Sequence, residues 1–282
     1  MRRTKNVLSA SALILAASAA LGLTGCSSTP PQHLDVLSVD GRDGGGVVPS
    51  YDALMRIGAA ARNGGDLANA VGVYRRASDV DLLNPAPLVA AGDVLLEMGS
   101  VNEAIVAYNN ALLRGGENLP ALLGLAKAYL KSGKPALALE PLSKAYALNP
   151  DEPKVLLLLG VTKDLSGEHR EAQAWYRRGL ELAPGDAALT VDLALSLALS
   201  GDYSGAISML QPIAIGPRGS AQERQTLALI YGLRGNAVEA ARLNRIDLDD
   251  ASAEHNLAYY ATLRALPPEA RNRAILSSGG KS

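Results

Sequence analysis

Six glycines recur at intervals of 34 residues, and this spacing constrains the fold of the chain more than any other feature of its sequence. They are Gly65, Gly99, Gly133, Gly167, Gly201 and Gly235. An alanine follows each glycine by five residues, and a glycine or an alanine precedes each by seven residues. Three columns of small residues that keep one register over six periods indicate an internal repeat. We therefore interpret the chain as an array of repeated units.

Each unit has the pattern of two helices joined by a turn. In residues 121–131, apolar side chains recur every three to four positions at Leu122, Leu125, Ala126 and Tyr129, as expected for a helix with one apolar face. Glycine readily adopts the left-handed backbone conformation that ends a helix, and small residues let two helices approach closely. We predict a helical hairpin in each period and an all-α fold that grows by stacking neighbours.

The unit resembles the tetratricopeptide repeat (TPR), a helix-turn-helix motif of the same period. The residues of the fourth unit that match its signature are Leu159, Gly160, Gly167, Ala172, Tyr176 and Pro184. The signature tryptophan of the first helix is replaced by Leu54, Leu88, Leu122, Leu156, Thr190 and Arg224, so the last two units are the least typical. The resemblance covers about residues 51–247 and implies a TPR solenoid of about six repeats.

The repeats set the domain boundaries. We assign residues 51–250 to the solenoid and residues 251–276 to C-terminal capping helices, because the last repeat of such an array has an apolar face to cover. Pro267 and Pro268 are expected to interrupt the capping segment. Residues 277–282 are predicted to form a disordered tail.

Residues 1–25 have the three parts of an export signal: a basic start, a short apolar run and small residues at the end. They lead into Leu23-Thr24-Gly25-Cys26, which resembles the bacterial lipobox, and Cys26 is the only cysteine in the chain. The resemblance implies cleavage before Cys26 and acylation of its thiol, which would anchor the protein stably to a membrane. The alternatives are an ordinary signal peptide with an incidental cysteine and an uncleaved anchor.

Residues 26–50 form the predicted tether between this anchor and the solenoid. The segment contains Pro30, Pro31 and a glycine triplet and has little apolar periodicity. As a flexible coil it would have a mean reach on the order of 25 to 30 Å. Ser27 follows the cysteine in place of the aspartate that retains enteric lipoproteins in the inner membrane. By that analogy, we expect a lipid anchor in the outer membrane, with the protein facing the periplasm.

The residues contain no catalytic constellation. No nucleophile elbow, phosphate loop or dinucleotide fingerprint is present, and the three histidines and one cysteine are not at metal-ligand spacing. His169 is interpreted as a residue that packs between helices. The net charge of −1 and the lack of a Lys/Arg block give no indication of a nucleic-acid partner. We therefore predict a protein-interaction module that is not an enzyme and has no cofactor, metal or small-molecule substrate.

The expected binding surface is the concave side, which the first helix of each hairpin lines in arrays of this kind. An apolar stripe inside such a groove suits an extended or helical peptide of a partner protein. The predicted groove residues are Leu123, Lys127, Leu157, Val161, Asp164, Val191, Leu195, Gln225 and Leu229. The alternative is that the leucines among them pack between adjacent repeats or against the capping helix.

The C-terminal portion resembles the TadD lipoproteins of Tad (tight adherence, Flp) pilus systems. The residues that carry this resemblance are Arg224 to Leu229, Gly235, Asp247-Leu248 and Asn256 to Tyr260. It implies a pilotin-like role, in which an outer-membrane lipoprotein helps the secretin channel of the Flp pilus to localise or assemble. The implied partners are a secretin subunit, or another pilus component, and the membrane. The alternative is a general cell-envelope TPR adaptor for peptidoglycan or outer-membrane assembly machinery.

Overall fold

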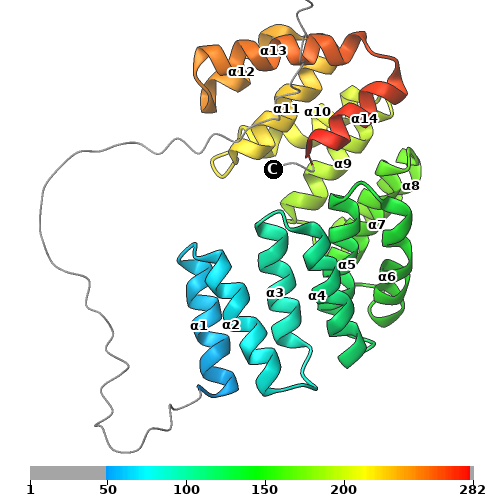
Figure 1. Ribbon diagram of the computed structural model, residues 1–282. Helices are drawn as coiled ribbons and strands as arrows, with labels where there is room; N and C mark the ends of the chain where they lie inside the picture. Colours follow the sequence, from blue (N-terminus) through cyan, green and yellow to red (C-terminus); the bar gives the residue numbers. More distant parts are fainter. Residues whose placement is uncertain (1–48, 280–282) are drawn as a thin grey trace, which may run out of the picture.

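The computed structural model describes residues 49–279, and within that range the chain is helical and contains no β-strand. The predicted export signal, Cys26 and nearly all of the tether lie outside the described residues. Six consecutive hairpins make up most of the structure (Figure 1). They are α1 (Tyr51–Asn63) with α2 (Leu67–Val80), α3 (Ala86–Glu97) with α4 (Val101–Arg114), α5 (Leu119–Lys131) with α6 (Pro135–Leu148), α7 (Pro153–Leu165) with α8 (His169–Leu182), α9 (Ala187–Leu199) with α10 (Tyr203–Ala214), and α11 (Ala221–Arg234) with α12 (Ala237–Asp247).

Each hairpin turns at one of the six glycines that define the repeat. Their backbone φ angles lie between 71° and 95°, in the left-handed region that residues with a Cβ rarely adopt. At Gly167 the turn also satisfies the last carbonyls of α7. Gly167 N donates to Asp164 O at 3.0 Å, and Glu168 N donates to Lys163 O at 2.9 Å. The prediction that these glycines end the first helix of each unit is confirmed.

The alanine column lies on the second helices, where the side chains face the neighbouring elements. All six alanines are fully buried, with 0% of their surface exposed: Ala70, Ala104, Ala138, Ala172, Ala206 and Ala240. A larger side chain at these positions would have no free volume to enter, since protein interiors are close-packed. This column therefore fixes the distance between helices along the array.

The small-residue column on the first helices makes room for aromatic rings, which differs from the close backbone approach that the sequence suggests. A Cβ atom at Gly160 would lie 2.3 Å from Cε1 of Tyr176 on the next helix. The same relation joins Gly58 to Tyr74 and Gly92 to Tyr108. Where the first helix carries Ala126, Ala194 or Ala228, the residue sixteen positions later is Leu142, Leu210 or Asn244, none of which is aromatic. Glycine and tyrosine thus occur as a pair.

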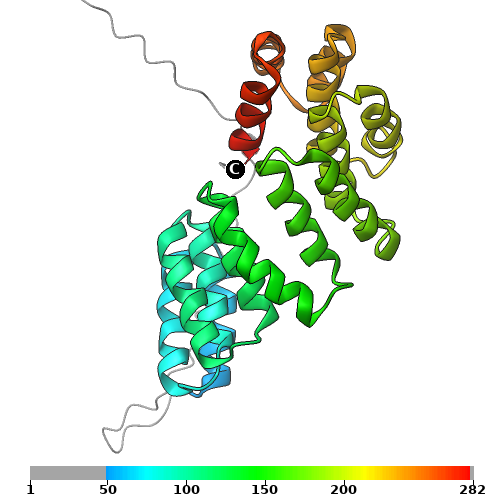
Figure 2. The same cartoon turned by 90° about the vertical axis from the view of Figure 1, so that its right-hand side faces the viewer.

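The hairpins stack so that their first helices adjoin one another. Helix α3 contacts α5, α5 contacts α7, α7 contacts α9, and α9 contacts α11, while each second helix contacts the first helix of the next hairpin. The small rotation from one unit to the next makes such a stack curve. Figures 1 and 2 show the first and last hairpins at opposite ends of a curved array. Among the described residues, no helix has the length and hydrophobicity needed to cross a bilayer.

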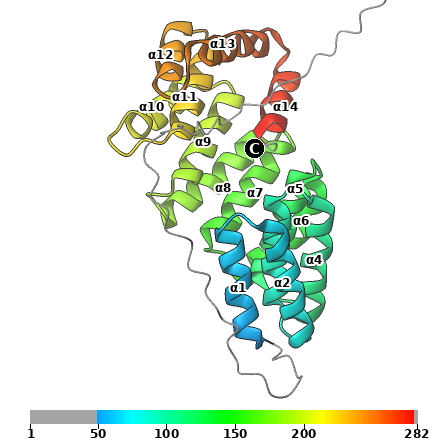
Figure 3. The same cartoon turned by 60° about the vertical axis from the view of Figure 1, so that its left-hand side comes forward.

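Two further helices follow the hairpins. Helix α13 (Asp250–Ala265) packs on α11 and α12 and buries Tyr260 and Leu263, so it covers the end of the stack. Helix α14 (Pro268–Gly279) instead turns back toward α7 and α9, as Figure 3 shows. The turn occurs at Leu266, whose backbone is extended (φ −76°, ψ 150°), because the two prolines that follow disfavour a continuous helix.

The structure differs from the sequence-based expectation for this region in two respects. Only α13 covers the end of the stack, although the sequence predicts capping helices over residues 251–276. Residues 277–279 are helical, although a disordered tail was predicted from residue 277 onward. Ile275 is 4% exposed and anchors the helix, so residues of low helix propensity extend a helix that is already nucleated. Residues 280–282 lie outside the described range.

Candidate protein-binding groove

A cavity of about 350 Å³ opens on the face formed by the first helices. Helix α7 supplies Leu158, Val161, Asp164 and Leu165; Val161 lies three residues after Leu158, and Asp164 and Leu165 lie three and four residues after Val161, so all four share one helix face. Helix α5 supplies Lys127, Leu130 and Lys131, and α9 supplies Asp192 and Leu195. Three consecutive hairpins therefore build the cavity, and its wall combines aliphatic side chains with charges of both signs.

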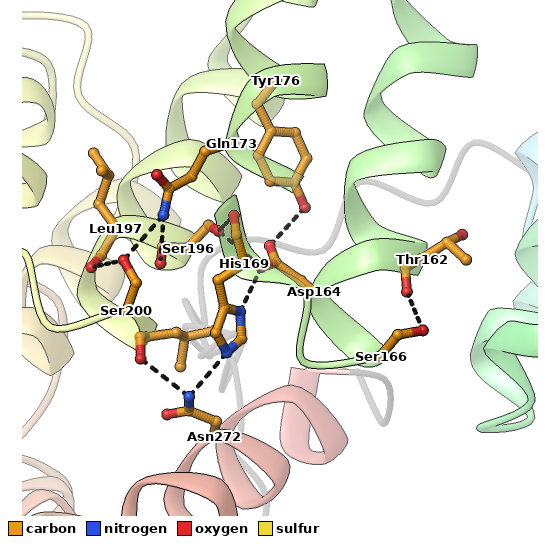
Figure 4. Close-up of polar contacts among 11 residues, drawn as sticks. Thr162, Asp164, Ser166, His169, Gln173, Tyr176, Ser196, Leu197, Ser200 and Asn272 are labelled. Atoms are coloured by element: carbon orange, nitrogen blue, oxygen red, sulfur yellow. Dashed lines mark hydrogen bonds and ion pairs between the residues drawn. The ribbon is translucent and has the colours of Figure 1, made fainter. Parts of the chain in front are cut away.

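Asp164 is the buried polar centre beside this cavity, with its side chain only 5% exposed. Its Oδ2 accepts a hydrogen bond from the hydroxyl of Tyr176 at 2.9 Å, and its Oδ1 accepts one from Ser196 Oγ at 2.7 Å (Figure 4). Burial and the nearby carboxylates raise the pKa of Tyr176, so its phenol stays protonated and acts as a donor. Helices α7, α8 and α9 are thus joined by one carboxylate.

His169 extends this network to α14. Its Nδ1 lies 2.7 Å from Asp164 Oδ1, and its Nε2 lies 2.9 Å from Asn272 Nδ2. With the ring proton on Nδ1 donated to Asp164, Nε2 is the acceptor for the amide of Asn272. The same amide donates to Leu199 O at 3.0 Å, at the end of α9. His169, interpreted from the sequence as a packing residue, is a hydrogen-bonded link between the array and α14 (Figure 4).

Asn272 positions α14 so that its last turns complete the cavity. Ile275 and Leu276 line the cavity on the α14 side, and Ile275 belongs to the same apolar cluster as the core of the last three hairpins. A nonrepeated helix therefore supplies part of the wall. The array and α14 therefore both bound the cavity.

Asp192 is a half-buried residue whose carboxylate lines the cavity. Within the described part of the chain, this carboxylate accepts no hydrogen bond and forms no ion pair, in contrast to that of Asp164. Burial, followed by repulsion from Asp164 and Asp186, raises the pKa of Asp192 to about 7. The cavity thus contains one carboxylate that has neither a hydrogen-bond nor an ion-pair partner within residues 49–279.

The structure brings together four of the nine predicted groove residues. Lys127, Val161, Asp164 and Leu195 line the cavity. Leu123, Val191 and Leu229 are buried in the core, Leu157 is half-buried against it, and Gln225 accepts a hydrogen bond from Asn256 of α13. The column that runs through Leu123, Leu157, Val191 and Gln225 therefore faces neighbouring elements, as the alternative interpretation of the sequence proposed. Of the column four residues later, Lys127, Val161 and Leu195 face the cavity, whereas Leu229 is buried in the core.

Sequence reasoning missed several residues of the cavity. Asp192 and Leu158 occupy equivalent positions of successive hairpins, three residues before Leu195 and Val161, so the helical period could have indicated them. No periodic signal could have indicated Ile275 or Leu276, because α14 is not part of a repeat. No group of three or more His, Cys, Asp or Glu side chains that could hold a metal ion occurs within residues 49–279.

A curved stack of helical hairpins with an aliphatic and charged cavity on its inner face defines an α-solenoid. Models of the tetratricopeptide repeat match residues 52–79, 89–153 and 130–190. These matches and the fold support a TPR protein, and TPR repeats imply a scaffold for protein interactions. The sixth hairpin and nearly all of the fifth, from residue 191 onward, lie beyond the matched segments, in agreement with their atypical first helices. Among curated proteins, none matches the sequence.

Solved structures share the fold. A tetratricopeptide repeat protein from Parabacteroides merdae has a TM-score of 0.64 and 18% identity, covering 74% of this chain and 84% of that one. Pseudomonas aeruginosa pilF has a TM-score of 0.59 and 18% identity, with coverage of 74% and 97%. The APC/C hetero-tetramer Cut9-Hcn1 has a TM-score of 0.65 and 19% identity, but the match spans 75% of this chain and only 43% of that one. At these identities the likeness concerns the fold alone.

Proposed function

We propose that this protein is an outer-membrane TPR lipoprotein that faces the periplasm and acts like a pilotin for the Tad/Flp pilus secretin. The carrying observation is a lipobox-like sequence at Cys26 followed by a TPR array with a cavity on its inner face. The resemblance of the C-terminal portion to TadD lipoproteins supports the choice of partner. The expected partner is a secretin subunit or another pilus assembly component.

The proposed mechanism has two steps. Acylated Cys26 holds the array close to the bilayer through the tether, which enters the structure just before Tyr51 of α1. The groove then captures a segment of a secretin subunit. Two binding events at one membrane raise the local concentration of subunits and so favour their assembly. A general envelope adaptor for peptidoglycan or outer-membrane assembly machinery would share both steps and differ in the captured protein.

The anchoring step can be tested with Cys26→Ser in the full chain. The variant is expected to fold normally, to leave the outer-membrane fraction and to lower the amount of assembled secretin, measured by fractionation and by secretin multimers on gels. Normal pilus output from a soluble, exported form would refute anchoring.

The partner step can be tested with charge reversal inside and outside the cavity. Lys127→Glu changes the wall, whereas Lys154→Glu makes the same change at an exposed site near the start of α7 that does not line the cavity. Loss of secretin co-purification from the Lys127 variant alone is the expected result. Equal recovery of secretin with both variants would contradict groove capture. Recovery of peptidoglycan or outer-membrane assembly proteins in place of secretin would favour the general adaptor.

A further inference from the structure

Asp164 and Asp192 are the two carboxylates of the cavity wall, and they differ in their partners. A charge removed from water is normally offset by an opposite charge or by several hydrogen-bond donors. Asp164 meets this rule, since Tyr176 and Ser196 donate to it and His169 lies within hydrogen-bond distance. Asp192 does not meet it within the described residues, and it lines an open cavity. An uncompensated carboxylate at such a position favours a cationic ligand.

The surroundings add to this preference. Asp164 and Asp186 are the neighbouring carboxylates, and their repulsion disfavours a second negative charge at Asp192. A cation beside Asp192 would relieve this repulsion. Tyr176 also lines the cavity, but its hydroxyl is already used as a donor to Asp164.

The shape and lining of the cavity distinguish between kinds of cation. A metal ion needs several oxygen or nitrogen ligands, and the described part of the chain offers no cluster of three suitable side chains. Aliphatic side chains form most of the wall, including Val161, Leu195 and Ile275. A lysine or arginine combines an aliphatic stem with a charged head, so it matches this lining.

We propose that the cavity binds a lysine or arginine side chain of a partner polypeptide, with the charged head paired to Asp192 and the stem against Val161, Leu195 and Ile275. The proposal rests on the function of the groove as a protein-binding surface and names the chemistry of the segment that it binds.

The opposite wall gives the bound segment a direction. Lys127 and Lys131 of α5 face the cavity, and Lys131 Nζ already donates to Leu96 O at 3.1 Å. Lys127 is exposed and forms no ion pair within the described range. A ligand with positive charge throughout, such as a polyamine, would be repelled on this side. The partner segment therefore carries a basic residue that faces α9 and an acidic residue that faces α5.

Selection of random short peptides displayed on phage, with the full-length chain as bait, tests this proposal. The selected peptides are expected to share a lysine or arginine beside aliphatic residues, together with an acidic residue. Their affinity for Asp192→Asn should fall about tenfold or more, since a desolvated charge pair loses its partner. Asp79→Asn, the same change at an exposed site on α2, should leave the affinity unchanged. Asp192→Lys should select acidic peptides instead.

Three results would overturn the proposal: no enrichment of any peptide, enriched peptides without a basic residue, or equal affinity for the wild type and Asp192→Asn. Spermidine is the probe for a small polyamine. Binding of spermidine that depends on Asp192, without enrichment of any peptide, would also overturn it. If a partner is found at the groove in cells but binds Asp192→Asn normally, this inference fails and the proposed scaffold function stands.

Discussion

Replacement of Asp192 by asparagine is expected to stabilise the protein at pH 8. Burial and the neighbouring carboxylates raise the pKa of Asp192 to about 7 from its ordinary value of 3.8. At pH 8 the carboxylate is ionised, and its ionisation destabilises the native state relative to the unfolded chain. Asparagine has nearly the same shape and no charge, so the substitution removes this cost.

The magnitude follows from the two pKa values. A pKa difference of one corresponds to a free energy of about 1.4 kcal/mol. The difference between the ordinary pKa of 3.8 and the native pKa of about 7 therefore sets an upper limit of about 4 kcal/mol on the gain in unfolding free energy. Because water reaches Asp192 through the cavity, the expected gain in unfolding free energy is about 1–3 kcal/mol. The native state binds the extra proton between the two pKa values, so wild-type stability falls as the pH rises through this window. The gain from Asp192→Asn is largest above pH 7 and fades toward pH 4.

Urea denaturation followed by far-UV circular dichroism at several pH values between 5 and 8 measures this gain. The m-values of the two proteins must agree, so that a change in midpoint reports a change in stability. Groups other than Asp192 titrate in both proteins and cancel in the comparison. Asp79→Asn on the exposed side of α2 should change the unfolding free energy by less than about 0.5 kcal/mol at every pH. Equal midpoints of Asp192→Asn and wild type at pH 8, or a gain that grows toward pH 5, would refute the reasoning.

Three further substitutions test the packing, the polar network and α14. Gly160→Ala places a Cβ 2.3 Å from the Tyr176 ring and should lower the unfolding free energy by about 1–3 kcal/mol. Gly72→Ala adds a Cβ to open space on α2 and should raise the unfolding free energy by about 0.5–1 kcal/mol. Similar thermal unfolding of the two variants would contradict this. Asp164→Ala removes the acceptor that Tyr176, Ser196 and His169 share and should lower the unfolding free energy by about 3 kcal/mol or more. A loss below about 1 kcal/mol in urea denaturation would argue against the network. Asn272→Ala removes the two hydrogen bonds that the Asn272 side chain donates to His169 and Leu199, so hydrogen exchange of the α14 amides should accelerate while α7 and α9 keep their protection. Unchanged exchange would mean that these two hydrogen bonds do not hold α14.

The repeat period predicts most of the fold because each hairpin is built from contacts that are local in the sequence. Gly167 and its five equivalents have the left-handed backbone conformation, which glycine adopts more readily than any residue with a Cβ. Their spacing therefore locates the turn of each hairpin. The glycine and tyrosine columns also report a contact between two helices of the same unit, since Gly160 and Tyr176 are sixteen residues apart. Because such local contacts recur in every hairpin, the residues that make them recur at regular intervals in the sequence.

The candidate site was predictable only in part, for two physical reasons. A helical period identifies an apolar face but not its edge, so Leu157 and Val161, one turn apart, could not be assigned separately to the core and to the cavity. The return of α14 depends on a contact between Asn272 and His169, which are 103 residues apart and lie in elements that share no period. Asp192 has no distinctive sequence neighbours, and its isolation is visible only once the surrounding helices are in place.

A photo-cross-linking amino acid introduced at Leu195 in cells tests most directly whether the inner face of the array binds a polypeptide. Leu195 lines the cavity, and Val238 on α12, which is 78% exposed, is the matched position away from it. A covalent adduct with a partner protein from Leu195 and none from Val238 is the expected result, and the proposed function identifies that partner as a secretin subunit. Adducts of equal yield from both positions, or none from Leu195, would contradict a binding role for the groove.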